Sequence, residues 1–203
     1  MGFILLIIII GLGIYFIKKY NSLQTMNQNI KQARSNIYVL VKQKIAIINK
    51  FSEVVSKYCD YEQVTHLTAS ENYTEMARDT ASAINSIQAL ANMYPNLKAD
   101  GQYAVFLDNI SQNERELTQR REIYNAQVNF YNSEIAQIPM VFVASALGFK
   151  EAPYFDAENE NAIDSFSGAN PEAIKELALK GTEQLKDKLK KIKEDNQKKN
   201  EDK

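Results

Sequence analysis

The first 17 residues, MGFILLIIIIGLGIYFI, contain no charged side chain. As a helix they would span about 26 Å at 1.5 Å per residue, slightly less than the roughly 30 Å hydrocarbon core of a bilayer. Lys18 and Lys19 can extend their amines to the headgroups, and the aromatic residues beside them suit the interface. We therefore expect residues 1–19 to be a transmembrane anchor whose partner is the lipid bilayer.

A cleaved signal peptide is the alternative interpretation of this run. Signal peptides have a basic segment before the apolar run and a small-x-small cleavage site after it. Here no Lys or Arg precedes the run, and residues 14–19 read IYFIKK. An uncleaved anchor is therefore favoured.

Charge is unevenly distributed along the chain. The formal net charge is only −1, but residues 1–50 contain seven basic residues and no acid, whereas residues 51–170 contain seventeen acids and seven bases. The positive-inside rule places the N-terminus outside and everything after Lys18 in the cytoplasm, as a single-pass membrane protein. The basic residues near the anchor also suit anionic lipid headgroups, and the acidic middle argues against nucleic acid as a partner.

The rest of the chain reads as long helices. Apolar residues recur at helical spacing from about Met26 to Tyr58, and no Pro or Gly lies between Gly13 and Pro95, so this helix should continue from the anchor. A weaker pattern predicts a second helix over 68–93. The prediction is an all-α fold, with an N-terminal transmembrane helix followed by an antiparallel four-helix-type bundle of long helices.

The third predicted helix has the most regular pattern. Its 3-4 spacing is sustained for five heptads, as in a coiled coil, and requires a partner along its whole length; only the first helix is long enough. Asp100 is a possible N-cap before this helix, and Pro139 ends it. The stripe consists of Tyr103, Leu107, Ile110, Glu114, Leu117, Arg121, Tyr124, Val128, Tyr131, Ile135 and Ile138.

Three domains follow from these patterns. Residues 1–19 are the anchor, 20–156 the helical bundle, and 157–203 an acidic linker, a Lys-rich amphipathic helix starting at Asn170-Pro171-Glu172 and a disordered tail. Residues 140–149 are apolar but too short to cross a bilayer, so a short helix closing the bundle end is favoured over a membrane-dipping loop.

Charged residues interrupt both stripes. Lys44 is in phase with the apolar residues of the first helix, and Glu114 and Arg121 lie on the stripe of the third. Helix curvature could let these long side chains reach the rim. The alternative is a polar layer inside the bundle, in which Glu114 pairs with Arg121 or Lys44, because buried charges are tolerated only when paired.

The pair Tyr124-Asn125 recurs seven residues later as Tyr131-Asn132. Both tyrosines fall on the stripe and both asparagines lie beside it. Aromatic core packing with flanking Asn hydrogen bonds is the favoured interpretation, and a ligand site is the alternative.

The sequence contains no recognisable catalytic, cofactor-binding or metal-binding motif. One Cys and one His exclude a closed Cys/His zinc site. Cys59 has no base near it other than His66, seven residues away, so thiol catalysis is not expected.

The run from Tyr94 to Phe155 resembles the LemA family of bacterial membrane proteins. The matching features are YPNLKA at 94–99, the L-x-x-I-x-x-x-E-x-x-L pattern at 107–117 that contains Glu114, Arg121, the YNxxVxxYN run, Pro139, and the Gly148-Phe149 to Tyr154-Phe155 close. The N-terminal layout is also similar, so the resemblance covers residues 1–156. It implies an N-out, membrane-anchored antiparallel helical bundle in the bacterial cytoplasmic membrane, with no established biochemical activity.

The expected function is therefore a non-enzymatic scaffold or protein-interaction module at the cytoplasmic face of the membrane, with an unknown protein partner. The alternative is a regulatory or sensory adaptor that binds a small ligand or peptide in the bundle. A polar pocket near Glu114, Arg121, Tyr124 and Tyr131 would favour the adaptor, and a packed core there would favour the scaffold.

Overall fold

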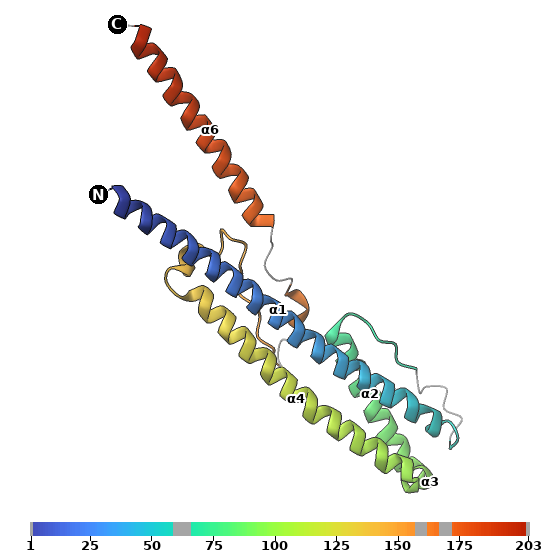
Figure 1. Ribbon diagram of the computed structural model, residues 1–203. Coiled ribbons are helices and arrows are strands. Elements are labelled where there is room, and N and C mark those ends of the chain that lie inside the picture. Colours follow the sequence, from blue (N-terminus) through green and yellow to red (C-terminus); the bar gives the residue numbers. More distant parts are fainter. Residues whose placement is uncertain (1, 59–65, 157–161, 167–171, 202–203) are drawn as a thin grey trace. The chain divides into compact units, whose positions relative to one another are not determined.

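The computed structural model describes residues 2–58, 66–156, 162–166 and 172–201 (Figure 1). These residues contain helices and no strand, which confirms the all-α prediction for the described part of the chain. The elements are α1 (Gly2–Val55), α2 (Tyr73–Met93), α3 (Pro95–Ala99), α4 (Gly101–Ala136), the 3-10 turn η1 (Met140–Phe142), α5 (Ala162–Ser165) and α6 (Glu172–Glu201). The chain forms two compact units, the first comprising Met1–Tyr131 with Ala152–Ser167 and the second Asn132–Glu151 with Gly168–Lys203.

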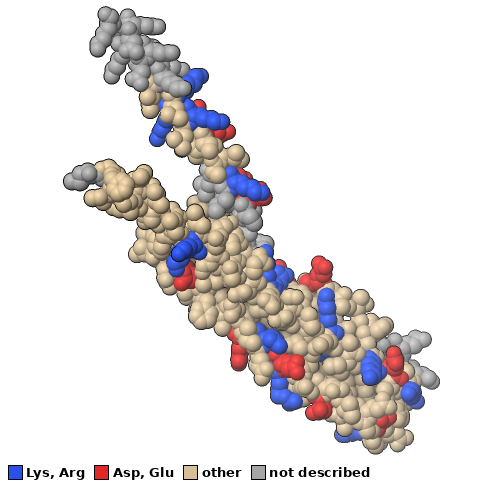
Figure 2. Space-filling view, viewed as in Figure 1, with Lys and Arg blue, Asp and Glu red and all other residues tan. Residues whose placement is uncertain are grey.

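Helix α1 is one unbroken helix of 54 residues, as the absence of Pro and Gly after Gly13 predicts. Its N-terminal part is long and apolar enough to cross a membrane, and none of that window is buried within the protein. The visible face of this part carries no Lys, Arg, Asp or Glu (Figure 2). The large apolar side chains from Phe3 to Ile14 are more than half exposed. Such exposure suits an apolar surrounding rather than water.

The C-terminal half of α1 packs against α2 and α4 in the first unit. Near one end Leu40 contacts Asn113, and near the other Phe51 stacks on Phe106, so α1 and α4 run in opposite directions. In contrast, Tyr38 lies beside Tyr73, the first residue of α2, while Phe51 shares a cluster with Leu90 near its end. Helices α1 and α2 are therefore parallel.

This arrangement does not confirm the predicted antiparallel four-helix-type bundle. Among the described residues of the first unit there are three long helices, α1, α2 and α4. Residues 67–72 lead back along α1, from Leu67, which is hydrogen-bonded to Asn49, to the start of α2 beside Tyr38. A connection of this kind allows two consecutive helices to point the same way.

The end of the three-helix core is apolar and aromatic. The rings of Phe51 and Phe106 are stacked with centroids 4.4 Å apart, and Tyr103 packs beside them. Short helix α3 contributes Leu97, which is fully buried in this cluster. The other buried members are Ile48, Val54, Val55, Ile87, Leu90, Ala91 and Ile110.

Side-chain caps define where two helices begin. Asn72 accepts a hydrogen bond from the backbone N–H of Glu75 at 2.9 Å and caps α2. The Asp100 carboxylate accepts one from Gln102 N at 2.8 Å, which confirms its predicted role as the cap of α4. The hydroxyl of Tyr58 donates to the other Asp100 oxygen at 2.6 Å, and this hydrogen bond is the main cause of the lowered pKa of Asp100.

The predicted stripe on α4 is buried along most of its length. Ile110, Leu117, Tyr124, Val128, Tyr131 and Ile135 are all buried. The prediction that Ile138 belongs to the buried stripe is wrong, because α4 ends at Ala136 and the Ile138 side chain is 79% exposed. Phe106 and Asn113 are buried although they lie off the stripe, because the first half of α4 faces two helices rather than one.

The second unit contains the end of α4, residues 140–149 and α6. Residues 140–149 form η1 followed by turns, rather than a regular helix. Gly148 has φ 83° in the left-handed region, where a glycine is favoured. Helix α6 extends to Glu201, further than the sequence pattern predicted. The predicted helix start at Asn170-Pro171 lies outside the described residues.

Candidate functional site

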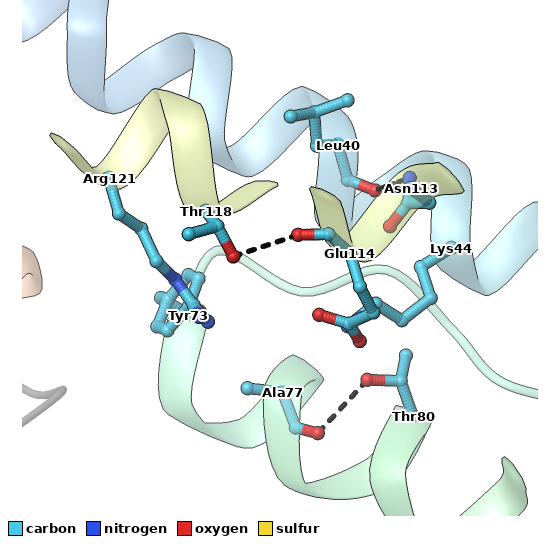
Figure 3. Close-up of polar contacts among 9 residues, drawn as sticks. All are labelled: Leu40, Lys44, Tyr73, Ala77, Thr80, Asn113, Glu114, Thr118 and Arg121. Atoms are coloured by element: carbon cyan, nitrogen blue, oxygen red, sulfur yellow. Dashed lines mark hydrogen bonds and ion pairs between the residues drawn. The ribbon is translucent and has the colours of Figure 1, made fainter. Parts of the chain in front are cut away.

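Lys44 and Glu114 form the polar contact that the interrupted stripes suggested. The Lys44 Nζ lies 2.5 Å from Glu114 Oε1, and the two side chains meet between α1 and α4 (Figure 3). The Lys44 side chain is only 7% exposed, whereas that of Glu114 is 46% exposed. The ammonium is thus buried, and its partner carboxylate lies at the rim.

Asn113, next to Glu114 on α4, adds a second polar contact to α1. Its amide nitrogen donates to the backbone carbonyl of Leu40 at 3.0 Å, and the side chain is buried (Figure 3). That carbonyl belongs to the regular ladder of α1 and uses a second lone pair here. Sequence reasoning missed Asn113 because it lies one position before the stripe.

Arg121 does not pair with Glu114. Its Nη2 donates to the hydroxyl of Tyr73, and its guanidinium lies 4.6 Å from the ring centroid of Phe155 and 5.8 Å from that of Tyr73. Tyr73 is fully buried and also meets the rings of Tyr38 and Phe155 edge to face, at 6.0 and 5.6 Å. Arg121 therefore joins an aromatic cluster by cation–π contacts.

Tyr124 and Asn125 hold the segment that returns along the bundle, residues 152–156. The Tyr124 hydroxyl donates to the Pro153 carbonyl at 2.8 Å. The Asn125 amide binds both backbone groups of Phe155: its nitrogen donates to the carbonyl at 3.0 Å, and its oxygen accepts from the N–H at 2.7 Å. We call this reciprocal pair of hydrogen bonds an amide clip.

The second Tyr-Asn pair is placed differently. Tyr131 is fully buried and packs edge to face against Phe166, with centroids 6.3 Å apart. Asn132 is half-buried, belongs to the second unit and also takes part in an interaction. Tyr124 and Tyr131 are thus both core residues, as the sequence predicted. The amide clip described above is formed by Asn125, the asparagine of the first pair.

A second amide clip joins α1 to the connection before α2. Asn49 donates through its amide nitrogen to the Leu67 carbonyl at 2.8 Å and accepts from the Leu67 N–H at 2.9 Å. In both clips one carboxamide satisfies the two backbone groups of a residue in an irregular segment. An extended segment without a neighbouring strand needs such partners when it packs on a protein surface.

Arg34, Tyr38 and Asp164 form a further polar contact that sequence reasoning missed. Arg34 donates to the Phe166 carbonyl at 2.9 Å, and its guanidinium lies 5.3 Å from the Tyr38 ring centroid. The Tyr38 hydroxyl donates to Asp164. Burial, followed by this hydrogen bond, raises the pKa of Tyr38. No sequence pattern links residues more than a hundred positions apart.

Burial raises the pKa of Tyr124 to about 12, above its ordinary value of 10.0. The unfolded chain therefore ionises first as pH rises, and the contribution of Tyr124 to stability is complete below pH 10 and is lost between pH 10 and 12. We expect the stability difference between the wild type and Tyr124→Phe to change by about 1 kcal/mol between pH 8 and pH 11. Urea titrations followed by circular dichroism at each pH measure this; a difference independent of pH contradicts it.

The Asn125 clip predicts a local effect. Asn125→Ala removes two hydrogen bonds worth about 1 kcal/mol each, so hydrogen exchange at the Phe155 amide should accelerate roughly 30-fold. Asn129→Ala is the matched control. Asn129 is exposed on the same helix, and it accepts a hydrogen bond from the hydroxyl of Tyr154 rather than from the backbone of the segment. Equal acceleration in both variants would mean that the clip does not hold the segment.

A groove of about 600 Å³ lies between α1 and α4 in the first unit. Phe51, Phe106 and Val54 contribute apolar surface, and Asn113 also lines it. Its other lining residues are mostly polar or aliphatic: Gln43, Ala46, Ile47, Lys50, Gln102, Val105, Asn109, Gln112 and Glu116. Glu114, Arg121, Tyr124 and Tyr131, around which the sequence placed the pocket of an adaptor, do not line this groove.

In the described residues, no group of three His, Cys, Asp or Glu side chains is placed to hold a metal ion. His66 is exposed, and Cys59 lies outside the described residues.

Where the structure describes the chain, the fold and these contacts define an all-helical protein with one N-terminal helix that is long and apolar enough to cross a membrane. The LemA family model matches residues 33–165, more than half of the chain, and the chain belongs to the LemA family.

Curated relatives extend this result. The chain is 25% identical to Protein LemA of Metamycoplasma hominis over 178 residues, which cover 80% of this chain and 81% of that protein. It is 32% identical to Magnetosome proteins MamQ 1 and MamQ 2 of Paramagnetospirillum magneticum over 74 residues. That alignment covers 36% of this chain and only 27% of each MamQ protein. No solved structure matches the chain.

Proposed function

We propose that this protein is a non-catalytic scaffold or protein-interaction module, anchored by α1 at the cytoplasmic face of the bacterial cytoplasmic membrane. The observation that carries the proposal is the continuity of α1. Its exposed apolar part and the part that forms the bundle core belong to one helix. Residues 20–55 of that helix are about 54 Å long. A bundle built on such a helix is held stiffly at a membrane.

The polar groups that could have formed a reactive site support a structural role. Lys44 is paired with Glu114, Arg121 with an aromatic cluster, and Asn125 with the backbone of Phe155. The antiparallel contacts of α1 with α4, together with their 3-4 spacing, support a coiled-coil-like pairing of these two helices.

The proposed orientation has a direct test. In a Cys59→Ser background, Gln119→Cys on α4 should resist a membrane-impermeant maleimide in intact cells and react after permeabilisation. Gly2→Cys, on the other side of the proposed span, should react in intact cells. Labelling of Gln119→Cys in intact cells would show that the helical bundle lies outside the cytoplasm, which contradicts the proposed orientation.

A second candidate function is an adaptor that binds a small ligand or peptide. The groove between α1 and α4 favours it, because apolar surface flanked by carboxamides suits a neutral polar ligand such as a peptide. This site differs from the one that the sequence suggested.

Photo-crosslinking can separate the two functions. A crosslinker at Val105, which lines the groove and is 59% exposed, is compared with one at Ile123, which is 45% exposed on the same helix and does not line it. Partners captured only from Val105 in living cells indicate the adaptor. Partners captured from Ile123 but not from Val105 indicate a scaffold that binds through other surfaces.

A further inference from the structure

Most of the described apolar residues of α6 lie on one side of the helix, although Leu179 lies about 120° from Leu185. At 100° per residue, Ala178, Gly181, Leu189 and Ile192 all fall within about 40° of Leu185. The side chains of Leu185, Leu189 and Ile192 are 62%, 54% and 55% exposed. This apolar face therefore needs a surrounding that the described structure of α6 does not supply.

The charged residues of α6 are ordered around this face. Lys175, Lys186 and Lys188 flank it, within about 100° of Leu185 on one side or the other. The acids Glu176, Glu183 and Asp187 lie about 160–180° away, on the opposite side. Three more lysines lie about 120–140° away, so that side carries both signs, whereas the charges nearest the apolar face are all positive: Lys180, Lys190 and Lys191 are the three. Charges of both signs are visible on α6 in Figure 2. Between residues 175 and 192 there are six Lys and three acids, a net charge of +3.

We propose that α6 lies along the surface of an anionic bilayer, with its apolar face among the acyl chains nearest the headgroups. Lysines beside an apolar face can place their stems in the apolar layer and their amines among the phosphates. Acids on the far side face water, where anionic lipid does not repel them. The order of charges thus matches a negative surface that touches only one side of the helix.

A second copy of α6 would fit this surface poorly. In a paired amphipathic helix the residues that flank the seam attract their counterparts, commonly as Glu with Lys. Here both flanks carry Lys, so two copies would place like charges together, and the acids point away from the seam. Charge complementarity therefore favours an anionic membrane as the occupant.

The chain can bring α6 to the membrane to which the proposed function anchors it. Arg34 donates a hydrogen bond to the Phe166 carbonyl. Arg34 lies 16 residues after Lys18 on α1, which corresponds to a distance of about 24 Å along the helix. Five residues lie between Phe166 and Glu172 and span at most about 17 Å, and α6 is about 45 Å long. These lengths allow most of α6 to reach the surface. Only this step rests on the proposed function.

The test uses the full chain reconstituted in vesicles of phosphatidylcholine, with or without phosphatidylglycerol. In a Cys59→Ser background, an environment-sensitive fluorophore is attached at Leu189→Cys or, as the matched control on the far side, at Asp187→Cys. With phosphatidylglycerol we expect blue-shifted emission and quenching by spin-labelled lipid at position 189 and not at 187. The triple variant K175Q/K186Q/K188Q should lose both signals, and none of these exposed positions belongs to the bundle core.

Each outcome has one meaning. A probe at 189 that stays as exposed to water as the probe at 187 in phosphatidylglycerol vesicles overturns the proposal. Protection at 189 that rises with protein concentration and ignores the lipid overturns it in favour of a second copy. Flotation of the chain with pure phosphatidylcholine vesicles reports the α1 anchor separately, so failure of the anchor and failure of α6 are distinguishable.

Discussion

Tyr73→Ala is expected to lower the free energy of unfolding by about 4 kcal/mol, the range measured when a large buried aromatic side chain is truncated. Tyr73 is fully buried, and its ring contacts those of Tyr38 and Phe155. Its hydroxyl is the acceptor for Arg121, so truncation also removes a partner of a guanidinium held within the bundle. Chemical denaturation of the full chain in detergent micelles measures the loss.

Two further variants divide this loss between packing and hydrogen bonding. Tyr73→Phe keeps the ring contacts and removes only the acceptor, so it should cost about 1–2 kcal/mol. Tyr94→Ala truncates a tyrosine that is 36% exposed and should cost much less. A Tyr73→Ala protein as stable as Tyr94→Ala would show that the aromatic cluster does not hold α2 against its neighbours.

Glu114→Ala is expected to lower stability by about 3 kcal/mol, because it leaves the buried ammonium of Lys44 without its carboxylate. The loss falls toward the lower end of the usual range for a broken buried pair, since Glu114 itself is 46% exposed and water can reach the site. Thermal and chemical denaturation of the full chain both report it.

The double variant K44M/E114Q is the informative companion. It removes the buried charge together with its partner, and replacing a buried ion pair with neutral groups is often nearly neutral for stability. We expect it to be within about 1 kcal/mol of the wild type. Glu116→Gln, an exposed carboxylate on the same helix, is the control for a general effect of charge. If Glu114→Ala melts like Glu116→Gln, the pair does not stabilise the bundle.

The long helices were predictable because each carries its own signal. The stripe from Ile110 to Ile135 predicted the buried face of α4, and the absence of Pro and Gly after Gly13 predicted that α1 continues from the anchor into the bundle. The direction of α2 was not predictable, since amphipathic spacing is the same for parallel and antiparallel neighbours. Its orientation depends on the return of the chain past Asn49, which no local pattern encodes.

The polar contacts were predictable only in part, for the same reason. Lys44 and Glu114 drew attention because a charge on an apolar stripe needs a partner, and each is the other's partner. For Arg121 the stripe indicated burial but not the aromatic cluster it joins. Arg34 and Asp164 gave no signal, because their roles depend on a segment more than a hundred residues away.

The Asn49 clip has a consequence for how this architecture can vary. It attaches the chain to α1 at Leu67, so the start of α2 depends on that attachment and not on the path the chain takes after Val55. Doubling the length of a flexible loop costs only about 0.6 kcal/mol in closure entropy. Insertions or deletions between α1 and Leu67 can therefore accumulate while the three packed helices keep their register. The Asn49 side-chain amide fixes the position of Leu67 on α1 whatever the length of the loop before it.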